Sequence, residues 1–273
     1  MKDIGPIFRA LMHNPMGALL IALQIALTLA IVTNAAFIIQ QRSDNIARPT
    51  GLDEANTAVF YTNLFDSKVD KRQLFRDDLE AIRAIPGVVA ATHTNAIPAS
   101  GSGWGEDLYN DPDMPSNESI GFGKFMVDEH GLETFDLELV AGRNFRADEM
   151  VERSMEEITN PGILVVSQEL ADSLFPDGDA LGKTVWDEPN GKEPMRIIGI
   201  YDHMQLAWPT SSAINRSALW PEIVIFGGEM MYVVRSEPGQ LERVMTDVEA
   251  YLSENRSRIV DTVRSFEESK RRT

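Results

Sequence analysis

An apolar run near the N-terminus, Met16–Ile39, reads MGALLIALQIALTLAIVTNAAFII and organises the rest of the chain. It lies within Ala10–Gln41, a longer run that contains no Asp, Glu, Lys or Arg. Its 24 residues would form a helix of roughly 36 Å, whereas the hydrocarbon core of a bilayer is about 30 Å thick. A helix also satisfies its own backbone polar groups, which lipid cannot do. The stretch therefore predicts a transmembrane helix over residues 16–39.

Two other interpretations of this stretch fit its length and composition less well. The apolar part of a cleaved signal peptide is usually only ~7–15 residues long and ends at an A-x-A-like site. The run here is longer, and Thr33-Asn34-Ala35 matches such a site poorly. A buried core helix rarely runs this far without a charge. An uncut membrane anchor is the interpretation we adopt.

Polar residues interrupt the apolar stretch, and they are Gln24, Thr28, Thr33 and Asn34. Polar side chains in membranes usually face another helix and form hydrogen bonds across it. We therefore expect a helix–helix interface here. The alternative is a residue tolerated near the end of the span, which suits Asn34 better than Gln24.

The N-terminal tail, residues 1–15, carries Lys2 and Arg9 against Asp3. Short basic tails tend to stay in the cytoplasm, whereas long domains cross the membrane largely regardless of charge. We therefore expect a bacterial inner-membrane protein with a cytoplasmic N-terminus and a large periplasmic domain.

Composition excludes several functions. The 273 residues include 42 Asp and Glu and 25 Lys and Arg, which gives a net charge of −17. A nucleic-acid partner is excluded because its binding needs a basic face. The absence of Cys excludes disulfides, thiolate catalysis and zinc held by Cys.

Beyond a polar linker, residues 40–56, the pattern predicts a split α/β subdomain. Residues 57–64 and 88–94 have the composition of strands, and the helix between them is expected to begin at Ser67, with Asp70 as a loose capping box. Two further strands, residues 222–226 and 231–235, flank Gly227-Gly228, and an amphipathic helix follows Pro238-Gly239. We expect residues 57–96 and 222–255 to form one subdomain.

Residues 97–221 predict an inserted, strand-rich subdomain, so the fold class is α+β. The segment Pro98–Glu118 is rich in Gly and Pro and predicts a long, mobile loop. A short helix is predicted at Gln168–Leu174, with Ser167 as its N-cap. The predicted strands are Ile120–Met126, Leu137–Ala141, Ile163–Ser167, Thr184–Trp186 and Met195–Tyr201.

The segment 256–273 is rich in Arg and Lys. A solvated helix end is one interpretation. The other is a juxtamembrane segment that approaches anionic lipid and leads to further membrane spans.

Two glycine-containing motifs superficially suggest a nucleotide site. Asp177–Thr184 ends in GKT, but the Gly that a P-loop requires is replaced by Asp177, and a predicted helix precedes the motif where a strand is needed. Gly101–Gly105 lacks the spacing of a dinucleotide loop. We expect no cofactor site and read both segments as turns or loops.

No catalytic or metal-binding residue is predicted either. Asp107, Asp111, Asp113 and Glu118 lack the alternation and central Gly of a calcium loop. The four histidines are His13, His93, His130 and His203, and no two of them have helical ligand spacing. Trp104 and Tyr109 remain as candidates for contact with a substrate or partner.

Three further stretches resemble a known family. They are Val127–Phe145, which contains Gly142-Arg143-Asn144-Phe145; Val165–Lys183, which contains Leu174-Phe175-Pro176 and Leu181-Gly182-Lys183; and Ile197–Asp202. In order and spacing they resemble the macrolide-exporter permeases of ABC transporters (MacB/FtsX type). The resemblance covers about residues 125–202, and the leading span agrees in layout.

The resemblance implies an anchor helix, a porter-like subdomain with a second subdomain inserted, and three later spans. It also implies a dimer with a second permease protomer, a separate cytoplasmic ATPase and a possible periplasmic adaptor. The sequence has neither an ATPase segment nor the later spans, so we read it as a fragment or one half of a permease. The expected role is non-catalytic: transmission of ATP-driven motion to cargo or a periplasmic partner in export or efflux.

Two other functions are compatible with part of this organisation. A membrane-anchored ligand sensor would share the anchor and an α/β outer domain, and an anchored periplasmic hydrolase would need a catalytic site that no motif indicates.

Overall fold

A computed structural model describes residues 15–66, 68–113, 115, 118–154, 157, 160–187, 193–225 and 227–272. The chain divides into two compact units, Met1–Arg48 and Pro49–Thr273. We call the second unit the main domain. The predicted cytoplasmic tail lies outside the described residues, apart from Pro15.

The first unit contains one long helix, α2 (Pro15–Ala47), none of whose residues is buried. By length and composition it is a candidate membrane span, and it is the one such helix among the described residues. It extends eight residues past Ile39, so the linker predicted at 40–56 is helical over its first half. No Gly or Pro interrupts residues 40–47, and the amide of Gln40 donates to Asp44 at 2.8 Å one turn later.

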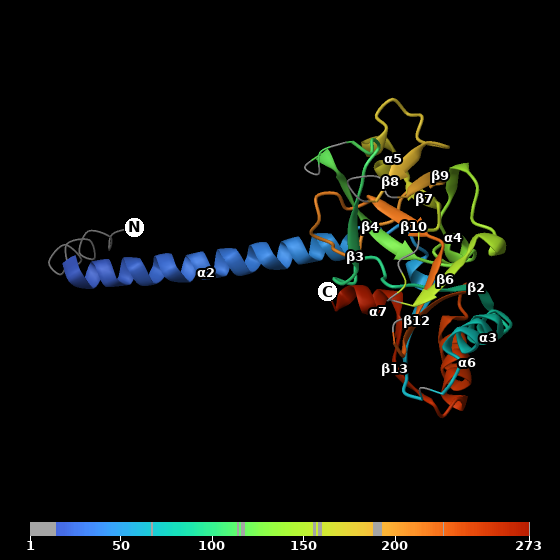
Figure 1. The fold of residues 1–273 in the computed structure, drawn as a ribbon. Coiled ribbons are helices and arrows are strands. Elements are labelled where there is room, and N and C mark those ends of the chain that lie inside the picture. Colours follow the sequence, from blue (N-terminus) through green and yellow to red (C-terminus); the bar gives the residue numbers. More distant parts are fainter. Residues whose placement is uncertain are drawn as a thin grey trace. The chain divides into compact units, whose positions relative to one another are not determined.

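The main domain contains a four-stranded antiparallel sheet assembled from both ends of its sequence (Figure 1). The strands are β1 (Thr57–Leu64), β2 (Val88–His93), β12 (Glu229–Ser236) and β13 (Arg258–Ser265), in the order β13-β1-β12-β2. Helix α3 (Lys71–Arg83) connects β1 to β2, and α6 (Leu241–Glu254) connects β12 to β13. This is the split β-α-β arrangement of ferredoxin-like folds, with a long insertion between β2 and β12.

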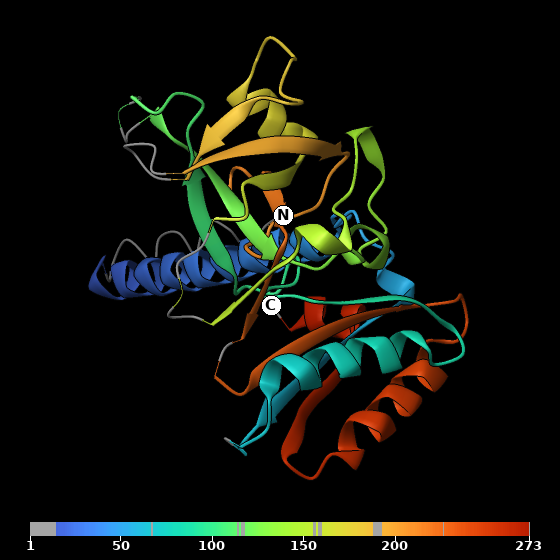
Figure 2. The same ribbon diagram turned by 45° about the vertical axis from the view of Figure 1, so that its right-hand side comes forward.

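Helices α3 and α6 cover the same face of this sheet (Figure 2). Their buried residues recur every three or four positions: Phe75, Leu79 and Ile82 on α3, and Val244, Val248 and Leu252 on α6. This spacing places each set on one stripe of its helix. Both stripes pack on the alternate residues Ala58, Phe60 and Leu64 of β1. The N-cap of α3 is Asp70, whose side chain accepts from the amides of Arg72 and Gln73; Ser67, predicted to begin this helix, is outside the described residues.

The insertion is built on a seven-stranded mixed sheet with the path β3-β4-β10-β7-β9-β5, and β8 also pairs with β9. Helix α5 (Gln168–Leu174) packs on this sheet, and its N-cap Ser167 accepts from Leu170 N. The strands are β3 (Trp104–Leu108), β4 (Ile120–Met126), β5 (Leu139–Gly142), β7 (Ile163–Ser167), β8 (Thr184–Trp186), β9 (Pro194–Tyr201) and β10 (Ser217–Trp220).

Smaller elements complete the main domain. A two-stranded parallel sheet joins β6 (Val151–Ser154) to β11 (Glu222–Ile225). The short helices are η1 (Glu54–Asn56), α4 (Gly131–Thr134), η3 (Ala147–Glu149) and α7 (Phe266–Arg271). The α+β fold class, with one apolar helix before a sheet-rich domain, is confirmed.

Two sequence-based predictions about these elements were wrong. Residues 104–108 of the predicted loop form strand β3, because Trp104–Leu108 pair with Lys124–Ile120 of β4. Within the predicted juxtamembrane segment, residues 258–265 form strand β13, which pairs with β1 and completes the four-stranded sheet.

Candidate functional site

The residues that the sequence singled out for contact or chemistry do not converge on one site. Tyr109 is buried and its backbone pairs with that of Trp186 in both directions, at 2.9 and 3.0 Å. It therefore belongs to the core and is not available to a partner. Trp104 is half-buried and lines a groove that is described below.

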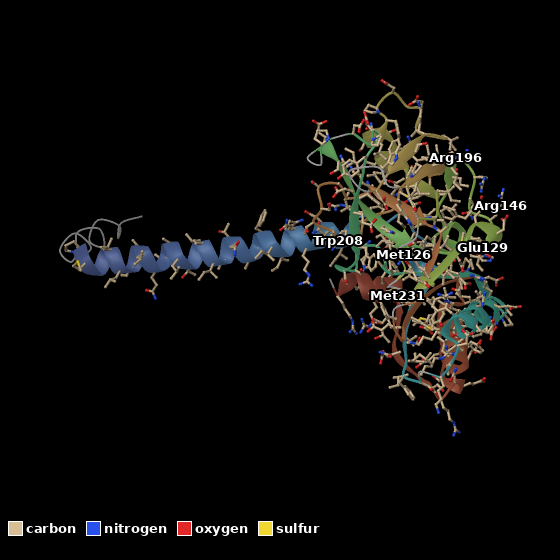
Figure 3. The ribbon with its side chains drawn as sticks, in the orientation of Figure 1. Met126, Glu129, Arg146, Arg196, Trp208 and Met231 are labelled. Carbon is tan, nitrogen blue, oxygen red and sulfur yellow. The ribbon has the colours of Figure 1, made fainter. Side chains whose placement is uncertain are left out.

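The two glycine motifs have structural roles. The backbone of Asp177–Thr184 runs from the end of α5 to β8, with Gly178 and Gly182 at positive φ and with a Lys183–Asp179 ion pair at 2.8 Å. In Gly101–Gly105, the ring of Trp208 (Figure 3) lies over Gly105, where an added Cβ would be 3.2 Å from it. The small residue makes room for the ring.

The histidines and the acidic cluster are dispersed. His93 is buried, with Nε2 2.8 Å from the carbonyl oxygen of Glu222, and burial lowers its pKa. His203 pairs with the adjacent Asp202 at 2.8 Å, and His13 is outside the described residues. Across the described part of the chain, no three His, Asp or Glu side chains are close enough to hold a metal ion.

The structural features that stand out are buried ion pairs, and the first ties β13 to α3. Asp78 and Arg258 have side chains only 0% and 2% exposed, and Arg258 Nη2 donates to Asp78 at 3.0 Å. Tyr232 and Tyr251 donate to the same carboxylate at 2.6 and 3.2 Å. Burial together with the Asp78 charge raises the pKa of Tyr251 to about 12. Every oxygen of this buried carboxylate thus has donors, as burial of a charge requires.

A second set of pairs fastens the insertion to the four-stranded sheet. Arg83 of α3 is ion-paired with the buried Asp128, which also accepts from Thr92 of β2 at 2.7 Å. Arg235 of β12 pairs with Asp136 at 2.6 Å. The apolar cluster between the sheets includes Val59 and Val233 from one side and Phe125, Leu132 and Phe135 from the other.

A third group of buried charges lies where β2, β4, β6 and β11 meet. Glu222 is fully buried and accepts from Arg153 at 3.0 Å, with Lys124 Nζ 3.9 Å away. Lys124 also lies over the ring of Trp220, 4.2 Å from its centroid. These contacts compensate the buried charge of Glu222, and together with the contact of His93 in β2 to the Glu222 carbonyl they join three sheets at one point.

The last junction joins the first and last segments of the main domain. Lys270 of α7 donates to both carboxylate oxygens of Glu54 in η1, at 2.8 and 2.9 Å. Glu54 also accepts from the amide and the hydroxyl of Thr50, at 3.1 and 2.7 Å. Lys270 is 6% exposed, so water screens this contact little. Two segments more than 200 residues apart are thereby held together; we call this contact the Glu54–Lys270 clamp.

The main domain also has a groove of about 520 Å³ on the sheet face opposite α3 and α6. Tyr61, Met231 (Figure 3), Thr262 and Arg264 project from the sheet, and Trp104 of β3 contributes from the insertion. Burial raises the pKa of Tyr61, against the charge of Arg264. The volume lies within the range of small-molecule sites.

Sequence reasoning missed the buried pairs, although one of them left a signal. Asp78 occupies the apolar stripe of α3, between Phe75 and Leu79 and four residues before Ile82. A charge on a core-facing stripe predicts a buried partner. The partner, Arg258, lies 180 residues later, and no local pattern indicates it.

An anchor-like helix and a split ferredoxin-like sheet with a strand-rich insertion agree with one family of transport proteins. The sequence profile of the MacB-like periplasmic core domain matches residues 18–251. The chain belongs to this family, that of MacB/FtsX-type ABC transporter permeases. The match ends before β13, the strand that completes the four-stranded sheet.

Solved structures with a similar arrangement have low sequence identity. The periplasmic region of MacB from Actinobacillus actinomycetemcomitans is 13% identical, with a TM-score of 0.48, covering 83% of this chain and 96% of that one. The extracellular domain of the ABC-type transporter YknZ from Gram-positive bacteria is 12% identical, with a TM-score of 0.44 and coverage of 75% and 100%. A domain of a putative permease from Porphyromonas gingivalis is 18% identical, with a TM-score of 0.44 and coverage of 74% and 84%. No curated protein sequence matches significantly.

Proposed function

We propose that this chain transmits ATP-driven motion in an export or efflux permease, from the membrane to cargo or to a periplasmic partner. In this proposal α2 is the anchor, with the N-terminal tail in the cytoplasm and the main domain in the periplasm. A separate cytoplasmic ATPase supplies the energy, and a second permease protomer completes the transporter. The chain itself has no catalytic role.

We propose a division of labour within the main domain. The four-stranded sheet with α3 and α6 is the porter-like part, and the seven-stranded sheet is the inserted part. The pair Arg83–Asp128, whose carboxylate is buried, and the more exposed pair Arg235–Asp136 support a stiff connection between them. A stiff domain can carry a displacement applied at one end to the other, because packed interiors are nearly incompressible.

The observation that carries the proposal is the Glu54–Lys270 clamp. Glu54 lies seven residues after the end of α2, and Lys270 lies in the last helix described. A force that reaches the domain through its first segment therefore acts on its last segment as well. Buried, multiply bonded ion pairs suit this task, since breaking one costs about 3–5 kcal/mol.

The test reverses the clamp in the assembled transporter. In nanodiscs with the ATPase that co-purifies, one spin label per protomer replaces the exposed Glu80. We expect the inter-protomer label distance to change on ATP addition in the parent, to stay constant in Glu54→Lys and in Lys270→Glu, and to change again in the double swap. The swap restores opposite charges at the same place.

The matched control reverses Arg271–Glu267, an exposed pair at 3.2 Å on the same helix. Exposed pairs contribute little, so these variants should behave like the parent. Absence of any co-purifying ATPase, or a label distance that ATP does not change in the parent, would contradict the proposal.

A second function, ligand sensing by a membrane-anchored domain, is favoured by the groove that Tyr61, Met231 and Trp104 line. It predicts a ligand that raises the melting temperature of the parent, and not that of Met231→Arg, when no ATPase is present.

A further inference from the structure

Strand β13 is an edge strand. It pairs with β1 on one side, and in the described part of the chain no strand pairs with its other side. Its eight residues, Arg258–Ser265, therefore present a row of backbone N–H and C=O groups. Such an edge can bind an extended peptide as an added strand.

The helix-covered side of this edge is acidic. A groove of about 400 Å³ lies between β13 and α6, and its uncharged lining is Met245, Thr246, Val260, Thr262 and Val263. Its carboxylates are Glu242, Glu249 and Asp261, and none of the three forms an ion pair with another described residue. Long basic side chains fit such a lining, since their aliphatic stems pack on apolar groups while their charges meet the carboxylates.

The opposite side of the same edge is mixed: Thr262 and Arg264 line the groove of about 520 Å³ there, and Ile259, nearer the start of the strand, is its exposed apolar side chain. Ile259 is 56% exposed, and among the aliphatic side chains of the described strands only Val140 of β5, at 57%, is more exposed. Ile259 is registered with Asn63, whereas Val260 and Val263 pack into the core under α6. Residues that are opposite one another in an antiparallel pair share a face. Asn63 is next to Leu64, which faces the helices, so Asn63 and its partner Ile259 lie on the face without helices. An added strand would place its alternate side chains beside Ile259.

We propose that the free edge of β13 binds an extended segment of a partner protein in which basic and apolar side chains alternate. The basic side chains enter the α6 groove, and the apolar ones pack beside Ile259. Charge selects this partner over a second copy of the chain, because a second β13 edge would bring its own Glu242, Glu249 and Asp261 to the junction. The net charge of −17 also favours encounter with a basic segment.

The register of β13 adds selectivity. Its pairing with β1 shifts between Tyr61 and Thr62, which leaves Asp261 as an extra residue. A bulge and a charge are features that keep edge strands from pairing indiscriminately. Here the charge is negative, so acidic and neutral strands are disfavoured more than basic ones. This inference does not depend on the proposed transport function.

The test uses the full chain in nanodiscs of phosphatidylcholine, which do not attract a basic peptide electrostatically. The probe is a fluorescein-labelled octapeptide that alternates Lys and Val, and binding is followed by anisotropy at low salt. We expect saturable binding, with no binding of the matched peptide that has Glu in place of Lys. Two further probes carry N-methyl groups along one or the other edge of their backbone. Methylation of the edge that pairs with β13 should abolish binding, whereas methylation of the other edge should leave binding unchanged.

The decisive variant is Glu242→Gln with Glu249→Gln, and it should bind the Lys-Val peptide about tenfold more weakly. The matched control is Glu80→Gln with Glu237→Gln, two exposed residues outside the groove. It removes the same charge and should bind like the parent. The proposal is overturned if both double variants lose affinity equally, if both N-methylated probes bind like the parent probe, or if the probe does not bind. It is also overturned if the chain dimerises and this dimer is dissociated by Ile259→Lys.

Discussion

At the scale of single residues, the stretch Gly142-Arg143-Asn144-Phe145 has a structural explanation for each position. Gly142 has φ of 78°, and a Cβ there would lie 2.3 Å from the carbonyl oxygen of Ile198. Arg143 holds Glu149 through two bonds of 2.7 Å, which lowers the pKa of that carboxyl to about 2. Asn144 donates to the carbonyl of Glu129 at 2.7 Å, and Phe145 is buried. The motif that resembles the family is thus a packed corner and not a chemical site.

Gly142→Ala should lower the free energy of unfolding by about 3 kcal/mol, because left-handed strain adds to a clash with strand β9. The control is Gly178→Ala: its φ of 82° is nearly the same, but nothing lies within 4 Å of the added Cβ. That variant should lose only about 1 kcal/mol. Urea unfolding of the full chain in detergent, followed by tryptophan fluorescence, measures both. Equal losses would mean that backbone strain alone requires Gly142.

At the scale of elements, the buried Asp78–Arg258 pair decides where β13 lies. The strand is at the edge of its sheet and is polar on much of its surface, so apolar burial alone holds it weakly. Arg258 at its first position also donates to the carbonyl of Leu252 at the end of α6, at 2.6 Å. One guanidinium therefore links α3, α6 and β13.

Asp78→Asn keeps the shape of the side chain but leaves Arg258 buried without a counter-charge. We expect a loss of about 3–5 kcal/mol in unfolding free energy. Asp179→Asn, which breaks the exposed Lys183–Asp179 pair at 2.8 Å, should cost less than about 1 kcal/mol. Hydrogen exchange should report the loss of stability in Asp78→Asn as faster amide exchange in β13 and α6. Slow exchange in β13 of Asp78→Asn would show that the pair does not hold the strand.

At the scale of the whole molecule, the main domain is held together at the few points where its sheets meet, and His93 lies at one of them. Its ring is buried against Phe75, with centroids 5.3 Å apart, and bonds to the backbone of Glu222 in β11. Burial lowers its pKa, although the nearby Asp128 opposes the shift. The folded protein therefore holds His93 neutral.

This arrangement predicts a pH dependence of unfolding. In the unfolded chain the pKa of His93 returns to about 6.5. The contribution of neutral His93 to the free energy of unfolding is complete above the unfolded-state pKa. It is lost as the pH falls through this value towards the lower pKa of the folded state, because the unfolded state then binds more protons. Between about pH 7.5 and 5.5 the free energy of unfolding should fall by about 1 kcal/mol. His93→Gln should lose this dependence, whereas the control His203→Gln, at an exposed site, should keep it. A pH profile unaffected by His93→Gln would contradict the prediction.

Sequence determined the elements whose signal is local. The apolar run of α2 needs no partner to be recognised, and β4, β7, β8 and α5 have the bounds that their composition and capping predict. Alternation along β1 and the stripes of α3 and α6 likewise indicate which face is buried, because each follows the period of its own backbone. The prediction of a split α/β arrangement came from the same patterns.

Elements that depend on distant partners could not be found from local patterns and became visible in the folded chain. Strand β3 is a Gly-containing segment that forms because β4 offers a ladder, and β13 is a charged segment that forms because β1 and Asp78 receive it. The Glu54–Lys270 clamp and the free edge of β13 also arise from contacts between residues far apart in sequence. Such contacts leave little trace in any one segment, since the free energy that stabilises them is gained only after the chain has closed on itself.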